Sequence, residues 1–343
     1  MPLIQNDSTK ITEPARTTRN IAPVFVLGCG RSGTTVLYHM LLSAGDFAVY
    51  RAESNAINLL EPRFGDLSVR KNKEKLMDAW LDSKLFARSG LDAIQIREKV
   101  VAECTNGGSF LRIVMEEIAR TQGVRRWADC TPEHLLHLPR IKETIPDALI
   151  IHIIRDGRDV ALSTDKLGYI KRAPWDKTPS IMVAGLYWEW MVRRGREAGR
   201  RLGNDYIEVR FEDLITEPRK TLGILGNFIE HELDYDRIQK VGIGSVSEPN
   251  TSFKGAPGDE KFSPVGRWKA GFAQKELAMF EALVGRTLEE LGYLLASQNP
   301  EQLDRDKLKR MRWLYQKYFD SKLYLKSRTP LGKVLVTRDL SWL

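Results

Sequence analysis

Short apolar runs alternate along the chain with longer segments in which apolar residues recur every three or four positions. Four runs have the length and the β-branched or aromatic content of strands: PVFVLG (23–28), RRWADC (125–130), ALIIHII (148–154) and DYIEVRF (205–211). Helical spacing follows them: Thr34 to Leu42, about 53–121, 181–201 and a Pro-started segment from about 218. This alternation predicts an α/β fold, a parallel sheet flanked by helices on both faces.

The same pattern divides the chain into three parts. Residues 1–20 are polar and predict a flexible N-terminal arm, and residues 21–297 predict one α/β domain with a helical insert at about 53–121. Residues 298–343 form a C-terminal extension with helical spacing. The stretch 242–266 holds five glycines and three prolines, which is typical of a long loop.

Composition narrows the class of protein. The 343 residues are 42% hydrophobic and 29% charged, ordinary values for a globular protein, and no apolar run approaches the roughly twenty residues that a spanning helix needs. The N-terminal stretch lacks the apolar core of a secretory leader. Three cysteines (Cys29, Cys104 and Cys130) are too few for a disulfide framework. We therefore expect a cytoplasmic protein.

The positive charge is concentrated in the C-terminal extension. Residues 301–343 hold 11 Lys and Arg against 5 Asp and Glu, whereas the whole chain holds 53 against 45. Aromatic residues are interleaved with these cations: Trp313, Tyr315, Tyr318, Phe319 and Tyr324. Either the aromatics pack on the body and the cations are solvated, or the segment contacts an anionic partner, such as an acidic acceptor or, weakly, a membrane surface. No motif for nucleic-acid binding is present.

A glycine-rich loop joins the first expected strand to the first expected helix. It reads Gly-Cys-Gly-Arg-Ser-Gly-Thr-Thr over 28–35, and loop amides together with a helix N-terminus favour an anion. Gly28, Gly30 and Gly33 match the dinucleotide fingerprint, and FAVYRAE (47–53) ends in the acid that this fingerprint requires. The loop also resembles the phosphate loop of kinases and NTPases, but Thr34 stands where their lysine is needed.

A third interpretation uses Arg31 as well. A cation just before Ser-Gly-Thr-Thr can reach the charge that develops between a 5′-phosphate and a transferring group. A second basic motif, Arg155-Asp156-Gly157-Arg158-Asp159, follows the expected central strand, and Ser163 lies eight residues after Arg155. Two basic pockets at strand ends suit a nucleotide with phosphates at both ends.

The two motifs together resemble the sulfotransferases that use 3′-phosphoadenosine-5′-phosphosulfate, closest to the tyrosylprotein and glycan branch. The resemblance runs from about 23 to 295 and implies a P-loop-like fold. It implies that Arg31, Ser32, Gly33, Thr34 and Thr35 hold the 5′-phosphosulfate, and that Arg155 and Ser163 hold the 3′-phosphate. It also implies that Pro264–Lys269 folds over the co-substrate, with cofactor contacts from Arg267, Trp268 and Lys269. Val209–Leu214 resembles a structural landmark of the family.

The acceptor's proton requires a base. Glu53 lies 22 residues after Arg31, nearly the spacing of a catalytic Glu in related glycan and tyrosylprotein enzymes. The histidine that the cytosolic small-molecule branch uses has no counterpart here, and His134 and His137 are expected to pack or solvate. Many relatives have Lys before Thr-Pro, where this chain has Cys130. Arg31 and Arg267 would then neutralise the leaving group, and Arg31 is a catalytic candidate beside Glu53.

We therefore expect an enzyme that transfers a sulfuryl group from 3′-phosphoadenosine-5′-phosphosulfate to a hydroxyl, without a metal. The acceptor class, whether small molecule, glycan, lipid or peptide, cannot be derived from the sequence, because acceptors are selected by variable loops. Two alternatives stay open: a P-loop kinase or NTPase, and a non-catalytic nucleotide-binding protein on the same fold.

Overall fold

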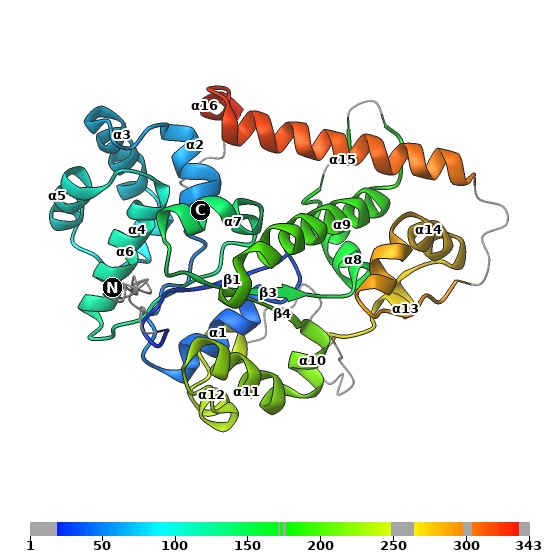
Figure 1. The fold of residues 1–343 in the computed structure, drawn as a ribbon, viewed down its shortest axis with the longest axis horizontal. Coiled ribbons are helices and arrows are strands. Elements are labelled where there is room, and N and C mark those ends of the chain that lie inside the picture. The colour runs from blue at the N-terminus through cyan, green and yellow to red at the C-terminus, as the bar shows by residue number, and fades with distance from the viewer. Residues whose placement is uncertain (1–18, 171, 174–175, 248–263, 298–303, 336–343) are drawn as a thin grey trace, which may run out of the picture.

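The computed structural model describes residues 19–170, 172–173, 176–247, 264–297 and 304–335. A parallel four-stranded sheet of order β2-β1-β3-β4 lies at its centre (Figure 1). The strands are β1 (Val24–Leu27), β2 (Ala128–Asp129), β3 (Leu149–Ile154) and β4 (Tyr206–Arg210). Each falls within one of the four apolar runs, and the predicted α/β class with a parallel sheet is confirmed.

The two central strands, β1 and β3, are buried on both faces because helices cover both. In β1, Val24 and Val26 belong to the hydrophobic core on one face, while Phe25 and Leu27 belong to the core on the other. A strand buried on both sides appears in the sequence as a continuous apolar run, which explains why VFVL and LIIHII were recognisable.

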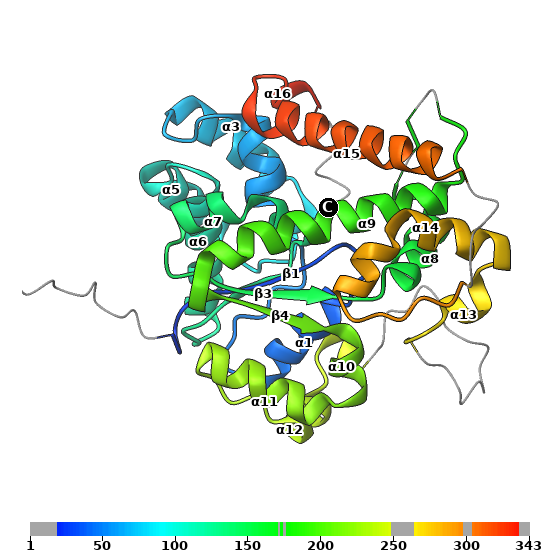
Figure 2. The same cartoon turned by 45° about the vertical axis from the view of Figure 1, so that its right-hand side comes forward.

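Figure 2 shows one set of helices below the sheet and another above it. The lower set is α1 (Thr34–Ala44), α10 (Phe211–Thr216), α11 (Pro218–Ile229) and α12 (Tyr235–Val241). The upper set includes α7 (Leu138–Thr144), α8 (Gly157–Leu167), α9 (Ser180–Gly199) and α14 (Gln274–Glu290). Shorter turns complete the body: η2 (Pro132–His137), η3 (Arg200–Asp205), η4 (Gly244–Val246) and α13 (Trp268–Gly271).

The expected insert is helical. After an irregular segment at 51–55 it consists of η1 (Ala56–Leu60, a π-helical turn), α2 (Glu61–Phe64), α3 (Arg70–Leu81), α4 (Lys84–Ala87), α5 (Ala93–Glu103) and α6 (Gly107–Thr121). FAVY (47–50) is not a strand of the sheet, and its Phe47 makes one isolated bridge to Arg126. The second strand that a dinucleotide fold needs after its first helix is therefore missing from this fully described segment.

The C-terminal extension is also helical. Helix α15 (Arg305–Arg328) lies along the outer side of α9, and the short α16 (Gly332–Leu335) rests on α2 (Figures 1 and 2). Within the described ranges, no helix combines the length and apolar character needed to cross a bilayer. Residues 1–18 of the expected arm and 248–263 of the expected loop lie outside the described residues, as do 298–303 and 336–343.

Candidate active site

The glycine-rich loop lies between the end of β1 and the start of α1, as expected. Gly33 precedes α1 with φ +96°, and a Cβ on it would lie 2.2 Å from the Phe211 ring. A Cβ on Gly28 would lie 2.5 Å from the Ile153 carbonyl oxygen, so this glycine lets the loop approach β3 closely. Arg31 itself has φ +73°, an unusual conformation for a residue with a side chain.

The second basic motif lies at the same edge of the sheet. β1 and β3 are adjacent and parallel, so Arg155 follows β3 next to the loop that follows β1. Two hydrogen bonds join the motifs. The Arg31 Nε donates to the Ser163 Oγ at 2.9 Å, and the Arg155 Nη1 donates to the Arg31 carbonyl at 3.0 Å. The two motifs therefore form one site, and the second bond holds Arg31 in its unusual backbone conformation.

The segment 264–269 lies over this pair of motifs. The Asp159 carboxylate accepts hydrogen bonds from the backbone amides of Gly266 at 2.9 Å and Trp268 at 2.8 Å. Arg155 also donates through Nη2 to the Pro264 carbonyl. The side chain of Trp268 is buried, and Lys269 is exposed. Asp159 is a site residue that the sequence interpretation missed, although its position four residues after Arg155 on one helix face could have indicated it.

The guanidinium groups of Arg31, Arg155 and Arg267 lie close enough to repel one another. Burial lowers the pKa of Arg155, and Arg31 adds to that shift. Burial and the neighbouring Arg155 and Arg31 likewise lower the pKa of Arg267. A bound anion would offset the repulsion between these cations, so this edge of the sheet favours binding of a negatively charged group.

Two buried polar atoms of the site have no hydrogen-bond partner within the described residues: the Ser32 Oγ and the Arg155 Nε. Unsatisfied buried polar atoms are costly, and those at a functional site indicate a ligand. A Cβ on Gly30 would meet nothing within 4 Å, so the middle of the loop borders open space. These features fit phosphate or sulfate oxygens at the loop.

An aromatic and an acidic side chain at the start of α10 support Arg155 and its neighbour Asp156. The Arg155 guanidinium carbon lies 4.6 Å from the centre of the Phe211 ring, and Glu212 accepts the Asp156 amide at 2.9 Å. Both belong to the segment 209–214, which we expected to be structural. Arg158 is different from Arg155, because it is buried against Asp156, Glu281 and the Trp268 ring.

Glu53 lies beyond α1 with an exposed side chain. Burial raises the pKa of the Cys130 thiol well above its usual value, and the charges of Asp129 and Glu53 raise it further, whereas a hydrogen bond with Thr34 opposes the shift. Cys130 is therefore a buried thiol next to Thr34 of the glycine-rich loop, and it lies within electrostatic range of the Glu53 carboxylate.

A buried network holds the segment that follows Glu53. His134 Nε2 accepts the Ile57 amide at 3.3 Å, so in the neutral ring Nδ1 carries the proton and donates to Asp129 at 2.9 Å. The Thr131 hydroxyl donates to the other Asp129 oxygen at 3.1 Å and lies 3.3 Å from the Ser54 hydroxyl. His134 is thus packed, as expected, and it connects β2 to the chain beside Glu53.

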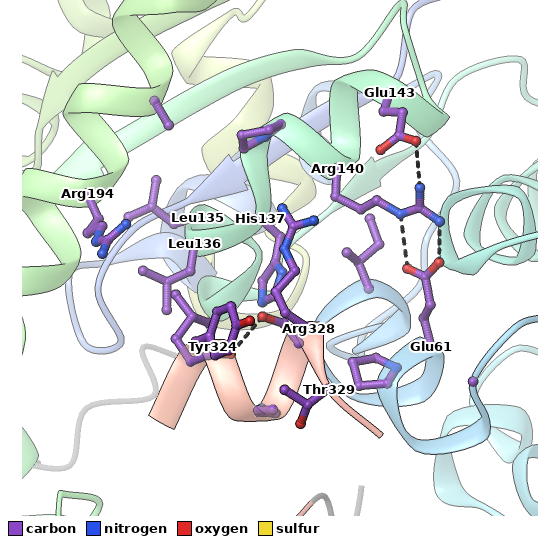
Figure 3. A pocket seen from close by; sticks show the side chains of 18 of the residues that line it. Glu61, Leu135, Leu136, His137, Arg140, Glu143, Arg194, Tyr324, Arg328 and Thr329 are labelled. Carbon is purple, nitrogen blue, oxygen red and sulfur yellow. Dashed lines mark hydrogen bonds and ion pairs between the residues drawn. The ribbon is translucent and has the colours of Figure 1, made fainter. Parts of the chain in front are cut away.

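A cavity of about 1000 Å³ opens elsewhere, between α15 and α16 on one side and α2, α7 and the end of α9 on the other (Figure 3). Many of the charged side chains that line it form ion pairs with one another, for example Arg140 with Glu61 and Glu143, and Arg194 with Asp320. None of its described lining residues belongs to 28–35, 155–163 or 264–269. The cavity borders the insert and the extension rather than the cationic edge of the sheet.

Comparisons with known proteins agree with this geometry. The family model described as "Sulfotransferase family" matches residues 23–235. The sulfotransferase domain from the Synechococcus PCC 7002 olefin synthase is 20% identical with a TM-score of 0.54, and the match covers 80% of this chain and 96% of that one. The sulfotransferase domain from the curacin biosynthetic pathway is 16% identical with a TM-score of 0.51, covering 80% and 99%. The two structures share the fold, and because the family match spans well over half of the sequence, this chain belongs to the sulfotransferase family.

Proposed function

We propose that this sulfotransferase takes its sulfuryl group from 3′-phosphoadenosine-5′-phosphosulfate and transfers it to a hydroxyl group. The observation that carries the donor assignment is the hydrogen bond between Arg31 and Ser163, 132 residues apart, which joins two anion motifs into one site. A nucleotide with anionic groups at both ends needs such a pair of neighbouring pockets. Three free, buried cysteines are consistent with action in the cytoplasm.

The glycine-rich loop would hold the 5′ end of the donor. The loop amides, the N-terminus of α1 and the Ser32 hydroxyl would bind the phosphosulfate oxygens, with Thr34 and Thr35 at the start of the helix. When bound, the donor would supply a sulfuryl group that passes in line to the acceptor oxygen, with adenosine 3′,5′-bisphosphate as the leaving group. Arg31 would neutralise negative charge on the leaving oxygen.

The second motif would hold the 3′-phosphate. Arg155 and Ser163 would contact it, and Arg267 would reach it from the overlying segment, with Lys269 and Trp268 beside it. Burial is the main cause of the lowered pKa values of Arg155 and Arg267, and neighbouring arginines lower them further. A phosphate dianion would offset both effects, which supports this assignment.

Glu53 would take the proton of the acceptor hydroxyl. Its exposed carboxylate is accessible to an acceptor, and both Glu53 and Thr34 of the loop affect the pKa of Cys130, which supports a position of Glu53 near the loop. A carboxylate base at this spacing supports placement in the tyrosylprotein and glycan branch. The helical insert begins three residues after Glu53, which supports a role for the insert in selecting the acceptor.

The donor assignment is tested by calorimetric titration with adenosine 3′,5′-bisphosphate, without magnesium, beside ATP and NAD. We expect selective binding of the bisphosphate, and Arg155→Ala should weaken it by roughly ten- to hundred-fold, because a charge-assisted phosphate contact is lost. Arg219→Ala, on the exposed surface of α11, is the control for loss of one arginine. Binding of ATP or NAD instead would overturn the donor assignment.

The role of Glu53 is tested with Glu53→Gln. Formation of bisphosphate from the donor would be followed over a panel of phenols, sugars, lipids and tyrosine peptides. We expect turnover to fall by about 10²–10⁴-fold with bisphosphate affinity unchanged, since only proton transfer is removed. Glu232→Gln, an exposed carboxylate on the surface, is the control. Unchanged turnover in Glu53→Gln would assign the base elsewhere, whereas bisphosphate binding without turnover by the wild type would indicate a binding protein.

A further inference from the structure

Helix α15 has an inner face that attaches it to the body. Tyr315 and Phe319 are buried. The Phe319 ring lies 5.4 Å from the rings of Tyr187 and Trp190 in α9, and the Tyr315 hydroxyl donates to Asp176 at 2.6 Å. Arg312 makes two 2.7 Å hydrogen bonds with the buried Glu189. The inner face therefore explains two of the aromatic residues that the sequence places in this segment.

Two further aromatics, Trp313 and Tyr324, are largely exposed, whereas Tyr318 is partly buried against the core. Tyr324 lies at the open cavity of Figure 3, as does Arg328. Trp313 is 57% exposed and Tyr324 is 61% exposed. They belong to one exposed stripe, which we call the outer stripe of α15, with residues spaced three or four apart: Arg310, Trp313, Leu314, Lys317, Ser321, Tyr324, Leu325 and Arg328. This spacing places all eight residues on one side of the helix. Internal packing does not account for them.

The outer stripe contains cations and apolar side chains and no acidic residue. The exposed Lys307, Lys309 and Lys322 flank it, and the exposed apolar residues Leu331, Val334 and Leu335 continue it beyond the end of α15. Three acidic residues belong to the described extension: Asp304 caps the helix, Asp320 pairs with Arg194, and Asp306, one turn before Arg310 on the same face, pairs with Lys309. The stripe thus presents positive charge and hydrophobic area together.

We propose that the outer stripe of α15 docks on an anionic membrane surface, with the helix lying in the plane of the interface. Cations complement acidic lipid headgroups, while Trp313, Leu314, Tyr324 and Leu325 enter the boundary between headgroups and acyl chains. Trp and Tyr favour this boundary because each has an apolar ring and a polar atom. A nucleic acid would satisfy the cations but would leave the two leucines without an apolar partner.

The geometry suits this mode of contact. A helix of 24 residues is about 36 Å long, so the stripe forms one extended line rather than a single point of contact. Helix α15 forms the outermost layer of the molecule above the sheet, whereas α11 and α12 lie on the opposite side (Figures 1 and 2). Docking through α15 therefore leaves the body in water and commits one face of the enzyme to the membrane.

The test is sedimentation of the full chain with vesicles of phosphatidylcholine, with and without phosphatidylglycerol, at low and high salt. We expect binding only to the phosphatidylglycerol vesicles, and weaker binding in high salt. The triple variant Arg310→Ala, Lys317→Ala, Arg328→Ala should lower the partition coefficient by at least about tenfold. Trp313→Ala with Leu325→Ser should lower it as well, because apolar area is lost.

The matched control is the triple variant Arg219→Ala, Lys220→Ala, Lys240→Ala, which removes the same charge from exposed positions of α11 and α12. It should bind like the wild type. Thermal unfolding would verify that all variants fold. Equal binding by the stripe variant and the control, no binding of the wild type to either vesicle, or preferential retention on a single-stranded oligonucleotide would each overturn the proposal.

Discussion

Single residues connect parts of the candidate site that are far apart in the sequence. Asp159 accepts two backbone amides from the segment 264–268, and Arg155 donates to the backbone of both Arg31 and Pro264. Each of these charged groups therefore holds a loop as well as contributing charge to the site. Substituting either one would therefore release a loop as well as remove a charge from the site.

Asp129 is the centre of the hydrogen-bond network that holds the backbone beside Glu53 in place. Burial opposes its ionisation, but the contacts with His134, Ser54 and Thr131 hold the pKa of Asp129 below its usual value. The carboxylate oxygens accept from the His134 ring, the Thr131 hydroxyl and the Thr131 amide. The network is inaccessible to solvent, so it acts by fixing the backbone rather than by touching an acceptor.

We expect Asp129→Asn to lower turnover with little effect on bisphosphate affinity. An amide cannot accept all three hydrogen bonds, and the unfolding free energy should fall by about 1–3 kcal/mol. The measurement combines steady-state kinetics, bisphosphate titration and denaturant unfolding. Asp213→Asn, on an exposed carboxylate, should change none of the three. Full turnover in a destabilised Asp129→Asn would show that the network serves folding only.

At the scale of elements, the turn from β1 into α1 depends on different glycines for different reasons. Gly33 combines a positive φ with contact to Phe211, whereas the space around Gly30 is open. The glycine pattern in the sequence does not distinguish these roles. A dinucleotide fingerprint and a phosphate loop share similar spacing, and the tertiary contacts of each position separate them.

Gly33→Ala should therefore be far more disruptive than Gly30→Ala. The added Cβ of Gly33→Ala would overlap the Phe211 ring and require a strained backbone, so we expect a loss of more than about 1 kcal/mol in unfolding free energy. Gly30→Ala should change stability by less than about 0.5 kcal/mol. Urea unfolding of both variants checks this, and equal stability would mean that the turn relaxes away from α10.

At the scale of the whole molecule, the C-terminal extension is held by a buried ion pair. Glu189 in α9 is fully buried, and it accepts from Arg312 of α15 and at 2.6 Å from the hydroxyl of Thr287 in α14. Three helices that are separate in the sequence meet at this one carboxylate. The extension is therefore part of the packed body, and its solvated cations lie on the other face of α15.

Arg312→Ala should destabilise the protein by about 3–5 kcal/mol, because it leaves Glu189 buried without its charge partner. The double variant Glu189→Met, Arg312→Met should recover much of that loss, since no uncompensated charge remains. Lys309→Ala, which breaks only the exposed pair with Asp306, should cost less than about 1 kcal/mol. Denaturant unfolding monitored by tryptophan fluorescence would compare the three variants.

Local patterns in the sequence were sufficient for the elements and for the chemistry of the loops. The runs VFVL and LIIHII are strands because strands buried on both faces need continuous apolar residues, and Gly28–Thr35 favours an anion because of its own backbone. Only the tertiary structure decided which of these segments meet. Packing between residues more than 100 positions apart determines three features: the bond from Arg31 to Ser163, the amides bound by Asp159, and the division of α15 into a buried face and an exposed stripe. The periodicity of apolar residues in the sequence indicates which side of a helix or strand is buried. Which other element packs against that side depends on the shape and charge of the whole fold.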